Sequence, residues 1–496
     1  MASSQHRLSV IIGTLVCLFA AAASGYDISG IKPTAFGLPE LNAVVRPSSG
    51  ATPYSGTDDE LSDFSRIRLV LDTGASGLVI FEKPSLFLGL PIAEFAGDDV
   101  VFEDVGIGGS TLFNVSDPLH LSVGRFDMEP SPPYNPATEN IDFPRQYSNI
   151  RAQLGPPGFA PWLGGLYSGA LRIAGIAGMP ILENKITVIQ PRFAEQFLLG
   201  DTIRSYLYEQ NLAALSGPGI LPTNLDIALT LKAFNRFTKV TPGGAPVPTL
   251  SNNPFIGPDP LAALEGQNPL PTNPPGVLIA YNGRQAEGSF LLDTGNQTSS
   301  ISKQLAALLG VRFKENTEGT ETPILENFDP DNPEAPGVEI ANQFTSVVQG
   351  IGGQETIVGF YLDSLQLKTR QGNANDDNDP NHINYLPAPV YIQDVTLQDP
   401  LTLETFTIAG IIGMNYLMAS FEGALPLFLS AGPFETLVLN FDQNHANANT
   451  LGLYAADFTP VAQPASTQVP FPFAMLLTVA AIILVSGLFA LRKKQH

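Results

Sequence analysis

Two stretches of the sequence share one pattern: LVLDTGASGLVI at residues 69–80 and FLLDTGNQTSSI at residues 290–301. Each is an apolar run that leads into Asp-Thr-Gly, as expected for a buried strand that ends in a tight turn. Two more motifs recur in the same order. They are GIGG, at 106–109 and 350–353, and IAGIAGMPIL at 173–182, which returns as IAGIIGMNYL at 408–417. Three motifs repeated in one order predict two copies of one folding unit.

The composition favours a turn-rich β protein. The 496 residues include 46 Gly and 43 Pro, and only 15% are charged, which is unlike a helical bundle or a coiled coil. This length exceeds what one hydrophobic core usually serves, so we expect two lobes. The net charge of -22 argues against a nucleic-acid partner, because phosphate binding needs clustered Lys and Arg.

The amino-terminal end predicts export. Residues 1–25 contain a basic start, an apolar run and the small residues Ser24 and Gly25, which is the layout of a secretory signal peptide. An uncleaved anchor is the alternative. Because the single cysteine, Cys17, lies inside this segment, the exported chain has no disulfides. Whether a propeptide is removed from the residues that follow stays open.

The carboxyl-terminal end predicts a membrane anchor. We expect a stalk at 456–472, an uncharged transmembrane helix at 473–491 and a basic cytoplasmic tail at 492–496. The Val469-Pro470-Phe471-Pro472 element before this helix resembles the PEP-CTERM sorting signal of Gram-negative bacteria, with Phe471 where that family has Glu. The resemblance implies an exosortase-type sorting enzyme as a partner. It leaves open whether the anchor is retained or cleaved.

Proline marks the expected division between the two copies. We predict an N-terminal lobe at 26–251, a Pro-rich linker at 252–276 and a C-terminal lobe at 277–455. Short helices are expected only at 302–309 and 193–209, and a hairpin at 277–292 around Asn282 and Gly283. The acidic loop GNANDDNDPNH at 372–382 is either a calcium loop or a solvated insertion.

The two Asp-Thr-Gly turns carry the candidate chemistry. Two carboxyl groups held about 3 Å apart share one proton, so one can act as base and the other as acid on a water between them. This division of roles suits amide hydrolysis without a metal or another cofactor. A single such turn is often no more than a strand end, so the inference depends on the pair. The sequence has no HExxH, no G-x-S-x-G and no P-loop, and His120, His382 and His445 form no metal-ligand pattern.

With two DTG turns in one chain, the sequence resembles the aspartic peptidases, as in pepsin-like enzymes. DTGA at residues 72–75 and the two GIGG segments are closer to retropepsins, so the chain resembles two retropepsin-like units in tandem. The resemblance implies a mostly β, bilobal double β-barrel with pseudo-twofold symmetry and a protein or peptide substrate. It also implies the site residues: Asp72 and Asp293 as the catalytic pair, Thr73, Gly74, Thr294 and Gly295 as the active-site turns, and Gly106, Ile107, Gly108, Gly109, Gly350, Ile351, Gly352 and Gly353 as substrate-binding flaps.

Two features depart from these families. The first flap region, residues 101–113, has no Tyr, unlike the flap of pepsins. Asn296 follows the second turn where the first has Ala75, and this amide is expected to change the hydrogen bonding of the carboxylate. The alternative function is therefore a catalytically inactive bilobal surface protein that binds peptides or extracellular matrix polymers.

Overall fold

The structure is a computed structural model of the whole chain. It describes residues 27–35, 38–56, 66–106, 109–125, 143, 145–159, 173–191, 202–208, 224–233, 244–261, 274–350, 353–398, 405–417, 434, 436–445 and 447–454. The chain divides into two compact units, residues 1–459 and 460–496, and all described residues belong to the first. The predicted signal peptide (1–25), the stalk, the transmembrane helix and the basic tail lie outside the described residues. Within the described part, no helix is long and apolar enough to cross a membrane.

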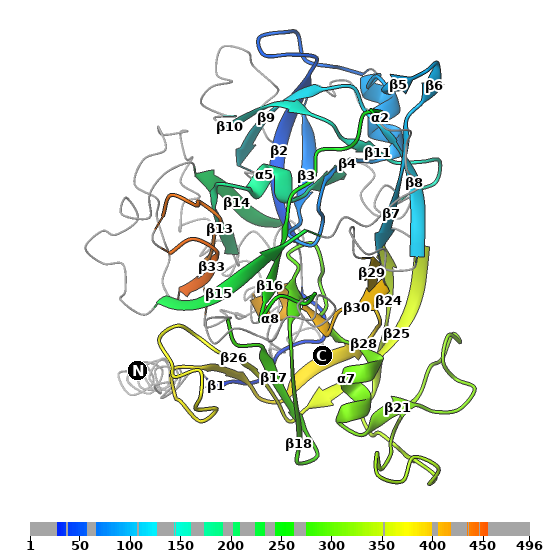
Figure 1. Cartoon of the computed structure of the whole chain (residues 1–496), viewed down its shortest axis with the longest axis vertical. Helices are drawn as coiled ribbons and strands as arrows, with labels where there is room; N and C mark the ends of the chain where they lie inside the picture. Colours follow the sequence, from blue (N-terminus) through cyan, green and yellow to red (C-terminus); the bar gives the residue numbers. More distant parts are fainter. Residues whose placement is uncertain are drawn as a thin grey trace, which may run out of the picture. The chain divides into compact units, whose positions relative to one another are not determined.

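The described chain is mostly β, which confirms the predicted fold class at this level (Figure 1). The first half contains β1 (Asp27–Ile28), β2 (Leu38–Arg46), β3 (Ile67–Leu71), β4 (Leu78–Ile80), β5 (Glu94–Phe95), β6 (Asp98–Asp99), β7 (Val101–Gly106), β8 (Gly109–Val115), β9 (Leu119–Arg125), β10 (Arg145–Ile150), β11 (Gln153–Leu154), β12 (Ile173–Ala177), β13 (Ile186–Pro191), β14 (Thr202–Tyr208) and β15 (Asn224–Lys232). Its helices are α2 (Glu82–Leu88) and α5 (Met179–Leu182).

The second half contains β16 (Asn253–Ile256), β17 (Val277–Tyr281), β18 (Arg284–Gly288), β19 (Phe290–Leu292), β20 (Ser300–Ile301), β21 (Val311–Phe313), β22 (Leu325–Asn327), β23 (Val338–Glu339), β24 (Phe344–Gly350), β25 (Gly353–Leu362), β26 (Ser364–Leu367), β27 (Ile383–Tyr385), β28 (Ala388–Ile392), β29 (Thr396–Gln398), β30 (Thr405–Thr407), β31 (Gly410–Ile412), β32 (Thr436–Asn440) and β33 (Thr450–Tyr454). Its helices are α7 (Lys303–Leu308) and α8 (Met414–Leu417).

The repeated motifs occupy equivalent places in the sheets. In the first copy, β12 pairs parallel with β3 and antiparallel with β4, and β11 pairs parallel with β4. In the second copy, β31 pairs parallel with β19 and antiparallel with β20, and β28 pairs parallel with β20. The GIGG segments join β7 to β8 and β24 to β25. The sequence repeat is thus matched by a repeat of strand pairing.

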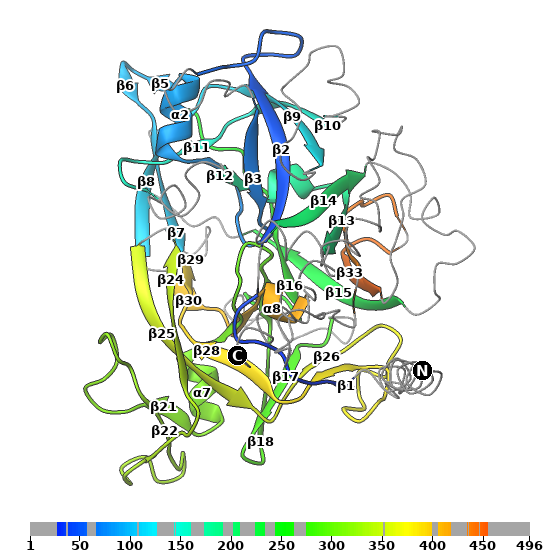
Figure 2. The same cartoon turned by 180° about the vertical axis from the view of Figure 1, so that it is seen from behind.

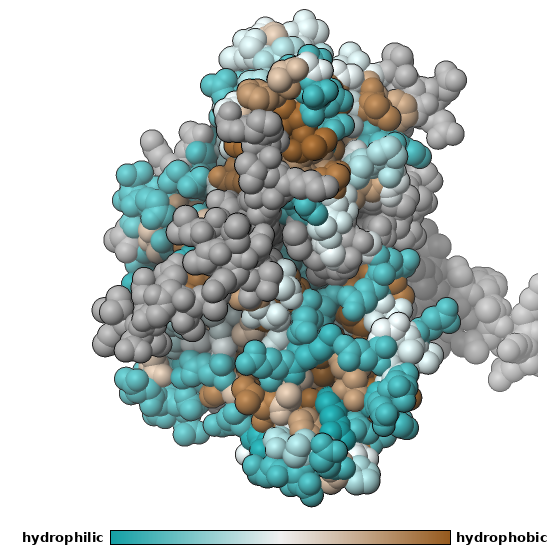
Figure 3. All heavy atoms as spheres, turned by 45° about the vertical axis from the view of Figure 1, so that its right-hand side comes forward, coloured by the Kyte–Doolittle hydropathy of each residue, from teal (hydrophilic) through white to brown (hydrophobic). Residues whose placement is uncertain are grey.

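The apolar strands that lead to the two Asp-Thr-Gly turns are paired on both sides, and their side chains pack in the core. Leu69 and Leu71 on β3, and Phe290 and Leu292 on β19, have no exposed surface and belong to one hydrophobic cluster. Such burial fixes the strand ends and so the position of the residues that follow. On the face drawn in Figure 3, hydrophilic residues cover most of the lower part, and hydrophobic residues gather near the top.

The expectations for helices were partly wrong. Helix α7 confirms the predicted helix at 302–309, and the Ser302 hydroxyl caps it by accepting from the Leu305 amide. The predicted helix at 193–209 is wrong where the structure describes it, because residues 202–208 form β14, which pairs with β13 and β2. In the part of the chain that the structure describes, three further short helices, α2, α5 and α8, were not expected. They follow strands directly and are too short for a helical period to mark them.

The predicted linker and hairpin also differ in detail. The start of the linker, Asn253–Ile256, is β16, which pairs with β15 and with β19. This pairing is the counterpart of β2 with β3, so the second copy begins ahead of β16. The hairpin turns at Asn282 and Gly283 as predicted, both with positive φ, but its second strand is β18. The run at 290–292 forms β19 instead and leads to Asp293.

Candidate functional site

The two Asp-Thr-Gly turns are held by the same backbone contacts. The Asp72 amide donates to the Ala177 carbonyl at the end of β12, over 3.0 Å. The Asp293 amide donates to the Ile412 carbonyl at the end of β31, also over 3.0 Å. Each acid therefore lies where its strand leaves the sheet, and the neighbouring glycine-containing strand fixes its backbone. The repeated motif at 173–182 and 408–417 thus supplies the carbonyl that binds the Asp amide in each copy.

Two threonine side chains join the turns to each other. The Thr73 hydroxyl donates to the Leu292 carbonyl (2.6 Å) and accepts from the Thr294 amide (3.0 Å). Reciprocally, the Thr294 hydroxyl donates to the Leu71 carbonyl (2.8 Å) and accepts from the Thr73 amide (3.1 Å). Both threonines are fully buried. This network of four bonds spans the two copies and makes the turns one rigid unit.

The structure brings the Asp72 and Asp293 carboxyl groups to the centre of this unit. A Cβ atom placed on Gly74 would lie 2.6 Å from the Asp293 carboxyl carbon and 2.7 Å from both of its oxygens. A Cβ atom on Gly295 would collide with the Asp72 carboxyl group in the same way. Each carboxyl thus packs on the glycine that follows the other acid. Only glycine fits at both positions, because any side chain would displace the opposite carboxyl.

Backbone amides hold the two carboxyl groups, though not equally. Asp72 Oδ1 accepts from the amides of Gly74 (2.7 Å) and Ala75 (3.1 Å), whereas Asp293 Oδ1 accepts from the amide of Gly295 (2.9 Å). The Ala75 and Asn296 amides also donate to the backbone carbonyls of Asp72 and Asp293, each over 3.4 Å. The two turns are therefore alike in backbone path and different in the number of amides on the carboxylate.

The Asn296 side chain turns away from the pair. Its Oδ1 accepts from both the amide and the hydroxyl of Thr298, over 3.0 and 2.9 Å. The sequence suggested that this side chain changes the hydrogen bonding of the carboxylate. The structure places its oxygen in a local turn instead, and the difference at the carboxylate arises from the backbone.

Two buried asparagines that the sequence did not single out support the turns. Asn253 on β16 accepts from the Ser76 hydroxyl (2.6 Å) and donates to the Thr73 carbonyl (2.8 Å). Asn415 on α8 accepts from the Ser299 hydroxyl (2.6 Å), which itself accepts from the Gly413 amide (2.8 Å). Neither asparagine has exposed surface. The one sequence signal was the place of Asn415 inside the repeated 408–417 motif.

Comparison with known proteins adds no further assignment. No protein-family model matches the chain, and no curated protein matches it.

The GIGG segments lie at the tips of two hairpins. Gly106 pairs with Gly109 at the end of β7 and β8, and Gly350 pairs with Gly353 at the end of β24 and β25. Figures 1 and 2 show these two hairpins reaching toward one another from different parts of the described chain. The tip residues Ile107, Gly108, Ile351 and Gly352 lie outside the described residues. Contacts between β7 and the β29–β30 hairpin also link the two copies in this region.

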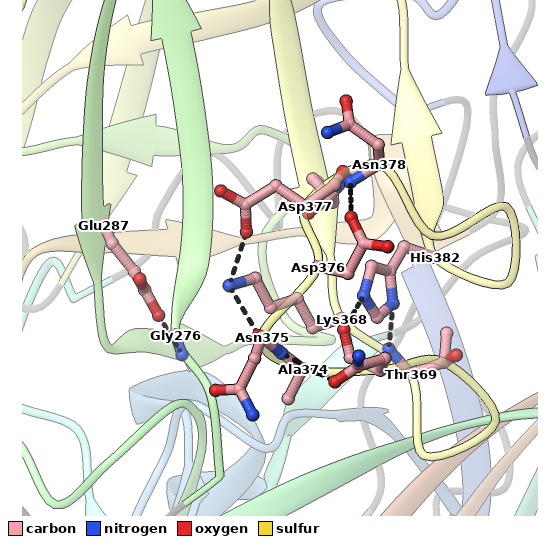
Figure 4. Close-up of polar contacts among 12 residues, drawn as sticks. Gly276, Glu287, Lys368, Thr369, Ala374, Asn375, Asp376, Asp377, Asn378 and His382 are labelled. Atoms are coloured by element: carbon pink, nitrogen blue, oxygen red, sulfur yellow. Dashed lines mark hydrogen bonds and ion pairs between the residues drawn. The ribbon is translucent and has the colours of Figure 1, made fainter.

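The acidic loop at 372–382 is organised around a protein cation (Figure 4). Lys368 Nζ lies 2.9 Å from Asp377 Oδ1 and 3.1 Å from the Ala374 carbonyl, and its side chain is 7% exposed. His382 is fully buried, with Nδ1 accepting from the Thr369 amide and Nε2 facing the Asn373 carbonyl. The Lys368 ammonium thus pairs with one carboxylate of this loop. Among the described residues, no group of three or more His, Cys, Asp or Glu is arranged to hold a metal ion.

Proposed function

We propose that the protein is an aspartic endopeptidase, with Asp72 and Asp293 as the catalytic pair. The observation that carries this proposal is the packing of each carboxyl group on the glycine after the other acid, locked by the reciprocal Thr73–Thr294 bonds. An ordinary strand end needs no such reciprocal contact. The proposed architecture is correspondingly a bilobal double β-barrel with pseudo-twofold symmetry, resembling two retropepsin-like units in one chain.

The proposed mechanism uses the two carboxyls as acid and base on one water. Two carboxyls that each pack on the other's turn repel one another when both are ionised, so the proposed pair shares one proton. The ionised carboxylate takes a proton from the water as its oxygen attacks the peptide carbonyl carbon, and the neutral carboxyl gives its proton to the carbonyl oxygen. As the gem-diol intermediate collapses, the carboxyl that took the water proton gives it to the amide nitrogen and the C–N bond breaks. The other carboxylate takes back one diol hydroxyl proton, so the product carbonyl forms and the pair again holds one proton. No cofactor enters these steps.

The amides on Asp72 support a division of roles. Two amide donors stabilise the ionised form of a carboxylate more than one does. Asp72 accepts two such bonds, and Asp293 accepts one from its own turn. In the free enzyme we therefore assign the charge to Asp72 and the proton to Asp293. Asp72 then activates the water, and Asp293 protonates the substrate carbonyl.

The substrate proposed for this site is an extended peptide. A peptide strand can gain main-chain hydrogen bonds from hairpins such as β7–β8 and β24–β25. The GIGG tips are suited to lids because glycine allows the backbone to change conformation, and lids that close over a site exclude water. The proposed place of action is outside the cytoplasm, on an exported chain that is anchored or sorted by its carboxyl-terminal segment.

Cleavage of an unfolded protein by the full chain tests the proposal. We expect proteolysis that pepstatin inhibits, and Asp72→Asn or Asp293→Asn should each lower kcat by about a thousandfold or more, since acid–base groups contribute 10²–10⁴-fold. Asp98→Asn, on exposed β6, is the matched control and should retain wild-type turnover. A folded wild-type chain that cleaves nothing between pH 2 and 8 would favour the peptide-binding surface protein instead.

A further inference from the structure

The segment ahead of β2 crosses from one copy to the turn of the other. Strand β2 belongs to the first copy, because it pairs with β3. A few residues earlier, Thr34 forms an antiparallel bridge with Thr298, and the Ala35 amide donates to the Gln297 carbonyl over 2.8 Å. Thr298 and Gln297 lie in the loop that begins at Asp293. The amino-terminal segment therefore contacts the second acidic turn before the chain enters the first copy.

The segment ahead of β16 makes the reciprocal crossing. Strand β16 opens the second copy, and just before it Leu250 forms an antiparallel bridge with Gly77. The Ser251 amide donates to the Ser76 carbonyl over 2.9 Å. These are the same two contacts, at equivalent places of the first turn. Because this bridge and this amide bond occur at both turns, the crossing is a repeated feature of the fold.

The amino-terminal segment is firmly built into the second copy. β1 pairs parallel with β27, and the Ile28 carbonyl accepts from the Leu386 amide over 2.7 Å. Ile28, Ile31 and Ala35 are at most 5% exposed and belong to the main hydrophobic cluster. Figures 1 and 2 both show β1, in dark blue, among strands from the second half of the chain, at the edge of the sheet with the order β1-β27-β26-β17-β18. Ordering this segment therefore buries apolar surface of the second copy.

A chain of hydrogen bonds joins the segment to the backbone that carries Asp293. Asn415 Nδ2 donates to the Lys32 carbonyl (3.3 Å), and Asn415 Oδ1 accepts from the Ser299 hydroxyl (2.6 Å). The adjacent Met414 amide donates to the Asn296 carbonyl (2.8 Å). The loop after Asp293 is thus held between α8 and the amino-terminal segment.

We propose that residues 27–35, which we call the arm, position the second acidic turn for catalysis. The inference rests on the proposed function and adds a way in which the activity is regulated. A propeptide is removed to create activity, whereas removal of the arm would abolish it. Processing of the exported chain must therefore leave Asp27 and the residues after it in place, and trimming from the amino terminus would switch the enzyme off.

A deletion with rescue tests the arm. The chain lacking residues 27–35 should stay folded and lose on the order of a hundredfold in kcat with little change in KM, the size of effect known for small misplacements of catalytic groups. The synthetic peptide DISGIKPTAFG, residues 27–37, should restore turnover, and a scrambled peptide should not. Wild-type turnover after deletion would overturn the proposal, and so would loss of turnover in a folded chain that the peptide leaves unrescued.

A second variant and a second readout keep the test decisive. If the deletion variant does not fold, Ala35→Pro is the second variant, because proline has no amide to donate to the Gln297 carbonyl. Full turnover in Ala35→Pro would overturn the proposal. Lost turnover in a folded Ala35→Pro chain would support it. Amide hydrogen exchange should rise more in residues 290–301, which the arm contacts directly, than in residues 69–80. Hydrogen exchange can be measured on a chain without activity. A wrong proposal for the arm can therefore be told apart from a wrong proposed function.

Discussion

At the scale of single residues, the site depends on the hydrogen bonds of two threonines and on the space beside two glycines. Thr73 and Thr294 use their hydroxyls both as donors and as acceptors across the two copies, and Gly74 and Gly295 leave room for the opposite carboxyl. The sequence predicted all four residues, because the motif is short and local. It could not predict that Asn296 would bond to Thr298, since side-chain direction depends on the folded loop.

The threonine network makes a prediction of its own. Thr73→Val keeps the shape of the side chain but leaves the buried Leu292 carbonyl and Thr294 amide without that hydroxyl. Each buried group left unpaired costs about 1–3 kcal/mol, so the free energy of unfolding should fall by at least that much. Thr294→Val should give a similar loss because its contacts are reciprocal.

Denaturant unfolding measures both threonine variants, with Thr345→Val, at an exposed position of β24, as the matched control. The control should change the free energy of unfolding by less than about 0.5 kcal/mol. If Thr73→Val were as mild as the control, the network would not hold the turns together.

At the scale of elements, local signals predicted part of the fold and pairing decided the rest. Strand β3 was predictable because its apolar residues follow one another in the sequence, and helix α7 because Ser302 directly precedes it. Strand β14 was mistaken for a helix, and β16 for a linker, because their identity comes from distant partners. The same holds for the arm, whose partners lie more than 250 residues away in the sequence.

The loop at 372–382 should respond to acid. The amides of Asn381 and Asn373 donate to Asp379 and lower the pKa of its carboxyl below 3.8. Because the folded-state pKa is lowered, this stabilisation of the loop is fully present above pH 3.8 and is lost as the pH falls through the lowered value. Hydrogen exchange of residues 372–382 should therefore rise at low pH, and Asp379→Asn should reduce that dependence. Equal acid sensitivity in the variant would contradict this account of the loop.

At the scale of the whole chain, two copies exchange their leading segments and share one pair of turns. Neither copy can form the site alone, because Asp72 lies against Gly295 and Asp293 against Gly74. The sequence repeat predicted the duplication, and it predicted that the acids would meet. It did not predict the crossing of residues 27–35 and 250–251, which no repeated motif marks. Catalysis, in this account, is a property of the pair rather than of either half.

The measurement that tests this most directly is a double-mutant comparison of turnover on an unfolded protein substrate. If Asp72 and Asp293 act as one unit on one water, Asp72→Asn, Asp293→Asn and the double variant should lower kcat by about the same factor, because groups that act together are strongly non-additive. Losses that multiply in the double variant, or a single variant with wild-type turnover, would contradict the shared-proton pair.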